Sequence, residues 1–395
     1  MTVSVPSMAA EASRRRPSWW PSEIEVELLR GACAQDAGVA GEIWRRLVAS
    51  GSLGALRGDA ARLLPLLYER LCAAGVNGTE LQPLRRAYAE VRSLNVATRT
   101  QAREALQRLV ASGVSPMLLK GLAIDAMAGE RGTRRIGDLD LMVRHDQLGV
   151  ALGALEEGGW HATDSSEPGA LVAKHSTCLR RPDTVEVDLH WVLSGRLALH
   201  RDPGAAMALF WGRARPAVYL GLEVLTLHPM HQLLHLLVHG ALVESRATAR
   251  WLADAWFVLR HARECEVADW RSLVDDVRSL GVSLQTWAAL RCLDYVFPGV
   301  VPPAVLAELR ASRWSLAERL LWLLDSRTVR QPLALDVVRT LRSHLSNQRF
   351  RALPSALLLY PRYLTANGYV VSPVQLARHV ARRRRERRER APGAA

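Results

Sequence analysis

The chain has 395 residues, 49% of them hydrophobic, so it is long enough for two or three compact units with a substantial core. No stretch of about 18 apolar residues is free of charge or histidine, which argues against a membrane span. The first arginines, Arg14 to Arg16, follow the mildly apolar start instead of preceding it, unlike a signal peptide. We therefore expect a cytoplasmic protein.

The formal net charge of +13 is unevenly distributed along the chain. Between Arg378 and Arg390 there are eight Arg and two Glu, a local charge of +6, so nearly half of the excess lies in one tail. Such a run could touch nucleic acid or acidic lipid, but a solvated tail is the commoner outcome. A nucleic-acid partner is thus possible through the tail but not favoured.

Lysine is scarce, since only Lys120 and Lys174 stand among 52 basic residues. Where arginine has replaced lysine almost everywhere, a retained lysine indicates a site that needs a compact ammonium group. The five cysteines are scattered singly with no CxxC pair, which predicts neither a disulfide framework nor a thiolate zinc site.

The periodic spacing of apolar residues changes twice along the chain. Ser22 and Glu25 form a capping-box pattern, and a helical period then runs to about Gly113. Short apolar or alternating runs follow, at Met117–Leu119, Asp138–Val143 and Val185–Trp191, and these predict strands mixed with helices. After about Arg201 the helical period returns and is expected to hold to about Leu364.

These changes predict an α+β fold, with a small mixed-sheet core flanked by N-terminal and C-terminal helical regions. The expected parts are a disordered leader at 1–20, an N-terminal helical region at 21–115, the core at 116–200, a C-terminal helical domain at 201–370 and a basic tail at 371–395.

The segment Ile136-Gly-Asp-Leu-Asp-Leu-Met-Val143 carries the clearest chemical signal. Alternate side chains of a strand share a face, so Asp138 and Asp140 should project together. Two neighbouring carboxylates repel each other unless a cation joins them, and Mg²⁺ accepts one or two carboxylates plus substrate phosphates. A bare DxD is otherwise more often a solvated turn.

Lys120 and Gly121 stand at a predicted strand-to-helix junction before the two aspartates. A glycine there could let backbone amides approach a phosphate at the helix N-terminus, and Lys120 could neutralise phosphate charge. Downstream, Glu186 and Asp188 fall on one face of an alternating run, and a two-metal site needs a further carboxylate. Asp188 is the preferred third metal ligand, with Glu186 as its competitor.

The run Leu118-Leu-Lys-Gly121, followed by Arg134-Arg-Ile-Gly-Asp-Leu-Asp-Leu-Met-Val143 and Glu186-Val-Asp-Leu-His-Trp191, resembles the uncharacterised bacterial nucleotidyltransferases of the polymerase-beta-like superfamily. The resemblance implies an Mg²⁺-dependent or Mn²⁺-dependent transfer of a nucleoside monophosphate (NMP) from an NTP to an acceptor, with pyrophosphate leaving. It also implies that Arg134 contacts the triphosphate or braces the metal-binding strand; a surface arginine is the plain alternative.

Other signals have two interpretations. His231, His235 and His239 are spaced by four along one helix face, which could be a metal stripe but more often is a polar face lining a cleft or packing on the core. Asp254 resembles a recurrent family acid and could face the active site, or it could be a surface acid paired with Arg250.

The predicted function is transfer of an NMP to the hydroxyl or phosphate of a small molecule, peptide or protein. By resemblance alone, a role in natural-product or polysaccharide biosynthesis is the first expectation. Two alternatives stand beside it: an RNA- or protein-modifying nucleotidyltransferase of the toxin type, and a nucleotide-binding relic without catalysis. The predicted site comprises Asp138, Asp140 and Asp188 as catalytic metal ligands, with Lys120, Gly121 and Arg134 binding the nucleotide.

Overall fold

A computed structural model describes residues 20–51, 60–129, 133–163, 175–194, 197, 202–240, 248–316, 318–319 and 322. Within these residues the α-helices are α2 (Glu23–Cys33), α3 (Ala37–Ala49), α4 (Leu64–Ala73), α5 (Gln82–Ala111), α6 (Lys120–Met127), α7 (Leu148–Glu157), α9 (Pro203–Gly212), α10 (Pro229–Gly240), α11 (Thr248–Glu264), α12 (Trp270–Ser279), α13 (Ser283–Val296) and α14 (Pro303–Ala311). The strands are β1 (Met117–Leu118), β2 (Leu139–Met142), β3 (His161–Ala162), β4 (Ser176–Arg180), β5 (Val187–His190), β6 (Arg215–Tyr219) and β7 (Leu222–Thr226).

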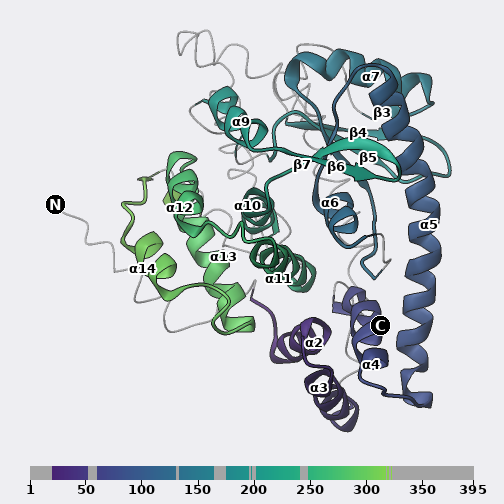
Figure 1. The fold of residues 1–395 in the computed structure, drawn as a ribbon, viewed down its shortest axis with the longest axis vertical. Helices are drawn as coiled ribbons and strands as arrows, with labels where there is room; N and C mark the ends of the chain where they lie inside the picture. The colour runs from purple at the N-terminus through teal and green to yellow at the C-terminus, as the bar shows by residue number, and fades with distance from the viewer. Residues whose placement is uncertain are drawn as a thin grey trace, which may run out of the picture.

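One mixed sheet forms the centre of the fold, with helices around it, and this confirms the predicted α+β class (Figure 1). Its seven strands run in the order β3-β4-β5-β2-β1-β7-β6. Strand β2 lies between β1, to which it is antiparallel, and β5, to which it is parallel. The three runs expected to be strands are β1, β2 and β5, each slightly shorter than predicted.

The hairpin β6–β7 corrects the expectation that only helices follow Arg201. Its two strands meet at a tight turn in which Leu220 and Gly221 both have positive φ, 52° and 75°. This geometry suits the twist of a two-residue hairpin, and glycine adopts it freely. Strand β7 then pairs in parallel with β1, so the sheet continues past residue 200. The Leu-Gly pair is a weak turn signal in the sequence, so the hairpin was not predicted within the helical pattern.

The N-terminal helices follow the predicted pattern. Ser22 accepts a hydrogen bond from the Glu25 amide, and the Glu25 carboxylate accepts one from the Ser22 amide, completing the capping box. Gly51, Gly75 and Gly113 follow helix ends with φ of 64°, 70° and 77°. Helices α2–α4 lie together at the end of the molecule away from the sheet, and α5 runs from them along its side (Figure 1).

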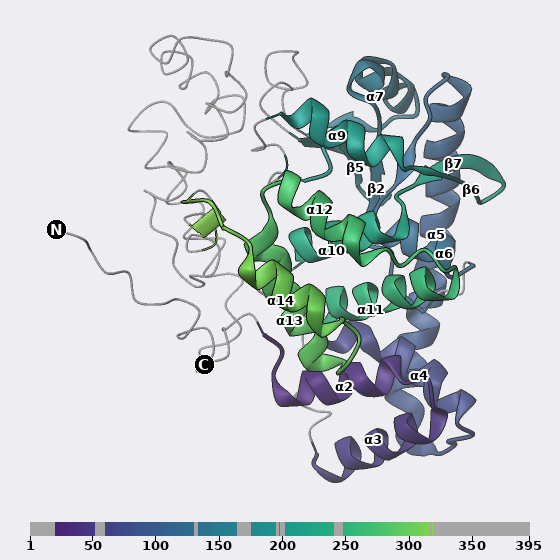
Figure 2. The same cartoon turned by 60° about the vertical axis from the view of Figure 1, so that its left-hand side comes forward.

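The helices that follow the sheet in the chain pack against both the sheet region and the N-terminal helices. α10 and α11 lie between the sheet and the N-terminal helices, while α12–α14 cover their outer side (Figures 1 and 2). The Arg30 guanidinium of α2 donates to the carbonyls of Tyr295 and Val296 at the end of α13, at 3.0 and 2.8 Å. Among the described helices, none combines the length and the apolarity needed to cross a membrane.

Several expectations concern residues that the structure does not describe. They are the leader at 1–19, Lys174 and the basic tail at 371–395, together with most of the chain after residue 316. The domain boundaries therefore stay predictions. The five cysteines are free thiols in the structure.

Candidate functional site

Two aspartates from neighbouring parallel strands face each other at the centre of the sheet. Asp140 of β2 is the register partner of Asp188 of β5, and Leu139 and Leu141 on either side of Asp140 are fully buried. Asp140 itself is only 1% exposed, whereas the Asp188 side chain is 29% exposed. The sheet register thus brings together two of the three carboxylates that the sequence singled out.

His190 lies between these carboxylates. Its Nε2 is 2.9 Å from Asp188 Oδ2 and 3.5 Å from Asp140 Oδ1. One ligand atom from each of Asp140, Asp188 and His190 lies within 4.8 Å of the others, a grouping compact enough to hold a metal ion. The alternation of this segment puts His190 on the same face as Asp188, although the predicted site gave it no role.

Lys120 approaches Asp140 from the start of α6. Its Nζ lies 2.6 Å from Asp140 Oδ1, and its side chain is 18% exposed. The backbone of Lys120 has φ of 40°, a left-handed conformation that costs a residue with a side chain roughly 1–3 kcal/mol and persists only where the surroundings require it. The lysine therefore contacts a predicted metal ligand directly, although the sequence suggested a phosphate contact.

Asp138 occupies a different position from Asp140. It precedes β2 by one residue and keeps an exposed surface, and it is absent from the compact group around His190. Protein atoms nevertheless surround much of its carboxylate. This desolvation, and after it the nearby charge of Asp140, raises the pKa of Asp138 to about 6.

Opposite charges dominate the centre of the site. Burial alone would raise the pKa of Asp140, but the Lys120 ammonium and the His190 imidazole lower it well below its ordinary range. Burial likewise would lower the pKa of His190, yet its hydrogen bonds to Asp140 and Asp188 raise it to about 9. Lys120 and His190 are thus both cationic at neutral pH and balance the charges of Asp140 and Asp188.

Glu186 points to a separate partner. It forms an ion pair with Arg180 of the adjacent strand β4, and its side chain is 46% exposed. Its carboxylate also accepts a hydrogen bond from the Cys178 thiol at 3.3 Å. These contacts hold Glu186 at the surface, two residues along the strand from Asp188.

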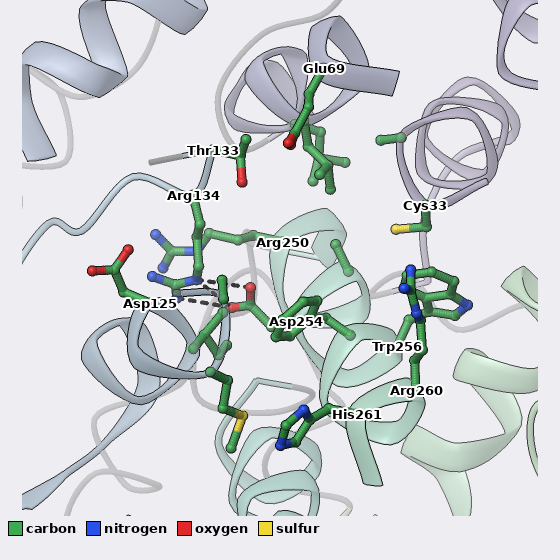
Figure 3. Close-up of a pocket in the computed structure, with 18 of the residues that line it drawn as sticks. Cys33, Glu69, Asp125, Thr133, Arg134, Arg250, Asp254, Trp256, Arg260 and His261 are labelled. Atoms are coloured by element: carbon green, nitrogen blue, oxygen red, sulfur yellow. Dashed lines mark hydrogen bonds and ion pairs between the residues drawn. The ribbon is translucent and has the colours of Figure 1, made fainter. Parts of the chain in front are cut away.

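Arg134 forms a buried fork with Asp254 of α11 (Figure 3). Its Nε lies 2.8 Å from Asp254 Oδ1, and its second terminal nitrogen, Nη2, lies 2.9 Å from Asp254 Oδ2. A Cβ atom on Gly121 would lie 2.5 Å from Arg134 Nη1. The absent side chain of Gly121 therefore makes room for the arginine, where the sequence had suggested a phosphate approach. Asp254 is buried, so of its two interpretations the surface acid paired with Arg250 does not describe it.

Asn95 of α5 holds the segment that leads into β2. Its amide nitrogen donates to the Arg134 carbonyl at 2.7 Å, and its amide oxygen accepts from the Ile136 backbone at 2.9 Å. Asn95 was not among the residues predicted from the sequence to support the site. The signal was a polar residue on the buried face of a long helix, where an amide side chain needs hydrogen-bond partners.

The histidines of α10 lie in two different surroundings. His231 is fully buried, and its Nε2 lies 2.9 Å from Asp276 Oδ2 of α12. Burial lowers the pKa of His235 and His239, and the charge of Lys120 adds to this effect, so these two rings lie near Lys120. His231 and His235 are buried, in agreement with the interpretation that part of the stripe packs on the core.

The donor set fits a hard divalent cation. Carboxylate oxygens suit Mg²⁺ and Mn²⁺, whereas imidazole nitrogen is a more typical ligand of zinc and later transition metals. Asp140 Oδ2 is buried and, among the described residues, has no hydrogen-bond partner. Such an unsatisfied buried oxygen costs free energy unless a cation or donor meets it.

Comparisons with known proteins agree with this geometry. A family model described as "Uncharacterised nucleotidyltransferase" matches residues 58–298, which is more than half of the chain and includes the whole sheet. A comparison with curated proteins finds no match.

Proposed function

This chain belongs to the uncharacterised nucleotidyltransferase family, and from that premise we propose that it transfers an NMP from an NTP to an acceptor hydroxyl or phosphate. The observation that carries the proposal is the pairing of Asp140 with Asp188 across two central strands, together with the buried Oδ2 of Asp140, which has no hydrogen-bond partner among the described residues. Acidic pairs of this kind are rare on buried strands unless a cation joins them.

Asp138, Asp140 and Asp188 would hold one or two divalent cations, Mg²⁺ or Mn²⁺. When bound, such cations would polarise the phosphates and favour loss of the acceptor proton. His190 keeps Asp140 and Asp188 in position through its hydrogen bond to Asp188 and its ion-pair contact with Asp140. Lys120 provides a compact positive charge at the start of α6, where the phosphates of the nucleotide would approach.

In the proposed reaction, the acceptor oxygen forms a bond to the α-phosphorus of the NTP. The bond from that phosphorus to the α,β-bridging oxygen breaks, and pyrophosphate leaves with the electron pair. The acceptor loses its proton in the same step, and the Asp188 carboxylate is the more accessible of the two paired acids to assist this loss. Arg134 braces the strand through Asp254 in this scheme instead of touching the triphosphate.

A nucleotide-binding protein without catalysis is the second candidate, because of Lys120. Its ammonium group lies 2.6 Å from Asp140 and already neutralises the carboxylate that would bind a cation. In an active enzyme Lys120 must shift toward the substrate phosphates when the cation binds. In a relic it would stay on Asp140.

Asp188→Ala separates these candidates from each other. We expect this variant to retain Mg²⁺-dependent NTP binding within about tenfold, or roughly 1.4 kcal/mol, and to lower turnover by about two orders of magnitude or more. The measurements are calorimetric NTP binding and single-turnover transfer to a lysate of the native host with each labelled NTP.

Glu186→Ala is the matched control, since it removes a carboxylate from the same strand whose partner is the surface residue Arg180. It should change neither binding nor turnover. If Glu186→Ala is the inactive variant, the third carboxylate is wrongly assigned. If the wild type binds NTP and transfers to nothing, the relic interpretation is favoured.

A further inference from the structure

A cavity of about 230 Å³ lies next to the catalytic centre, between the N-terminal helices and helices α6 and α11 (Figure 3). Its volume suits a small molecule or the end of a larger one. Six arginines line it: Arg62, Arg70, Arg134, Arg135, Arg250 and Arg260. So many guanidinium groups around one small space indicate an anionic ligand.

Four acids line the same cavity, fewer than the six arginines. Asp254 is paired with Arg134, and Glu264 is paired with Arg260 at 2.6 Å. Asp125 forms a bidentate pair with Arg99, which does not line the cavity. Glu69 is the fourth acid, and Figure 3 shows its carboxylate pointing into the space.

Arg70 brings a buried and unsatisfied donor to the cavity wall. Its Nε is buried and has no hydrogen-bond partner among the described residues. Arg70 and Asp254 both line the cavity, and both lie close enough to Cys33 for their charges to act on its thiol. A buried guanidinium nitrogen without an acceptor costs free energy, and an anionic ligand would supply that acceptor.

One wall of the cavity is aromatic. Trp256 and Phe257 of α11 line it, and the Arg260 guanidinium lies 5.7 Å from the centre of the Trp256 ring. Figure 3 shows Trp256 and Arg260 together across the space from Arg250. A ligand with an apolar or flat part next to its charge would contact both kinds of surface.

The cavity also adjoins the metal-binding strand. Arg134 and Arg250 lie close enough to Asp138 for their charges to act on its carboxylate. Lys120 and Asp140 do not line the cavity, and its α6 wall is the far half of that helix, from Ile124 to Ala128. A molecule held here would lie beside Arg134, whose charge acts on Asp138.

We propose that this cavity binds the anionic end of the acceptor, a small molecule that carries a phosphate or carboxylate group beside an apolar or aromatic part. This assignment of the acceptor rests on the proposed transferase function. The binding site itself rests on the arginines and the aromatic wall.

Binding is tested with inorganic phosphate and phenyl phosphate by calorimetry in the presence of EDTA, on the full chain. Phenyl phosphate should bind more tightly than phosphate because of Trp256. Arg70→Gln should weaken both by about tenfold, the loss expected for one charge-assisted hydrogen bond. Glu69→Gln should strengthen both by roughly two- to fivefold, an effect that misfolding would not produce.

Arg45→Gln, which changes an exposed arginine outside the cavity, should alter neither affinity. Absence of phosphate binding by the wild type would overturn the site. Equal weakening of Mg²⁺-dependent NTP binding in Arg70→Gln would show that the cavity holds the nucleotide, and would overturn the acceptor assignment.

The acceptor assignment has its own measurement. Phenyl phosphate should inhibit labelling of the small-molecule extract of the native host, and more extract should relieve the inhibition. Relief by more NTP instead would overturn the assignment. Phosphate binding that depends on Arg70, together with no transfer at all, would support the anion site and contradict the transferase function.

Discussion

Asp138 and Asp140 are separated by one residue, yet their carboxylates have opposite surroundings. Asp140 lies against the cations Lys120 and His190, which lower its pKa. Asp138 is desolvated and repelled by Asp140, which raises its pKa to about 6. Both are proposed metal ligands, so Asp→Asn at either position should abolish transfer. Their effects on stability should differ in sign.

Asp140→Asn is expected to destabilise the metal-free fold by about 3–5 kcal/mol, because it leaves the Lys120 charge without its partner and removes one of the two carboxylates beside His190. Asp138→Asn should instead raise the melting temperature at pH 7.5, since it removes a desolvated charge that has a like-charged neighbour. Thermal unfolding of both variants in EDTA measures the difference. A stabilised Asp140→Asn would contradict the charge assignment.

The pH dependence of Asp138→Asn follows from the raised pKa. The folded protein binds the Asp138 proton more tightly than the unfolded chain does, because the pKa rises from 3.8 to about 6. Protonated Asp138 therefore contributes its full stabilisation to the wild type below about pH 4, and this contribution is lost as the pH rises through 6. The difference in stability between Asp138→Asn and the wild type should accordingly vanish as the pH falls from 6 to 4, and it should be constant above pH 7.

Lys120→Arg should not be conservative. The ammonium group fits a short contact of 2.6 Å to Asp140 from a strained backbone with φ of 40°, and a planar guanidinium cannot occupy the same point. We expect kcat/KM to fall about tenfold or more, equivalent to about 1.4 kcal/mol, and Lys120→Met to be worse. Lys174→Arg is the natural control. Unchanged NTP affinity and turnover in Lys120→Arg would show that the lysine is incidental.

At the scale of elements, the Arg134–Asp254 pair joins parts of the chain that are far apart in sequence. Arg134 precedes β2, Asp254 belongs to α11, Gly121 of α6 makes room for the guanidinium, and Asn95 of α5 holds the backbone. A rigid ion pair of this kind keeps β2, and with it Asp140, in position relative to the helices.

Asp254→Asn should therefore destabilise the fold by about 3–5 kcal/mol and lower turnover, because it leaves a buried arginine without its counter-charge. Glu264→Gln on the same helix breaks the exposed pair with Arg260 and should cost less than about 1 kcal/mol. Chemical denaturation of the two variants provides the comparison. Equal stabilities would mean that the Arg134–Asp254 pair does not brace the strand.

At the scale of the whole molecule, the N-terminal helices are part of the fold around the site. Arg30 ties α2 to the end of α13, and Cys33 and Arg70 form one wall of the arginine-lined cavity. The family match begins at residue 58, whereas this wall also uses Cys33 of α2. The cavity is therefore shaped by residues from both inside and outside the matched segment.

The basic tail is expected to be dispensable. Deleting residues 378–395 should leave transfer to a small acceptor unchanged, because the run is remote in sequence from the core motifs and has the composition of a solvated segment. Turnover and melting temperature of the shortened and full chains test this. Loss of activity on RNA alone, restored at low salt, would instead favour a nucleic-acid acceptor.

The sequence by itself determined the local features. The helix ends at Gly51, Gly75 and Gly113, the capping box at Ser22 and the strand carrying Asp140 all follow from the conformational preferences of a few consecutive residues. It also identified the carboxylates from which a metal site could be built, since alternation along a strand is a local property.

Only the tertiary structure decided which of these groups meet. The pairing of Asp140 with Asp188 depends on strand register, and the contact of Arg134 with Asp254 joins residues 120 positions apart. The contact of Lys120 with Asp140 could likewise not be predicted from neighbouring residues in the sequence. The same holds for the close approach of Arg134 to Gly121. Such contacts arise when distant elements pack to bury apolar surface, and the charged groups that are brought inside must then find partners among themselves.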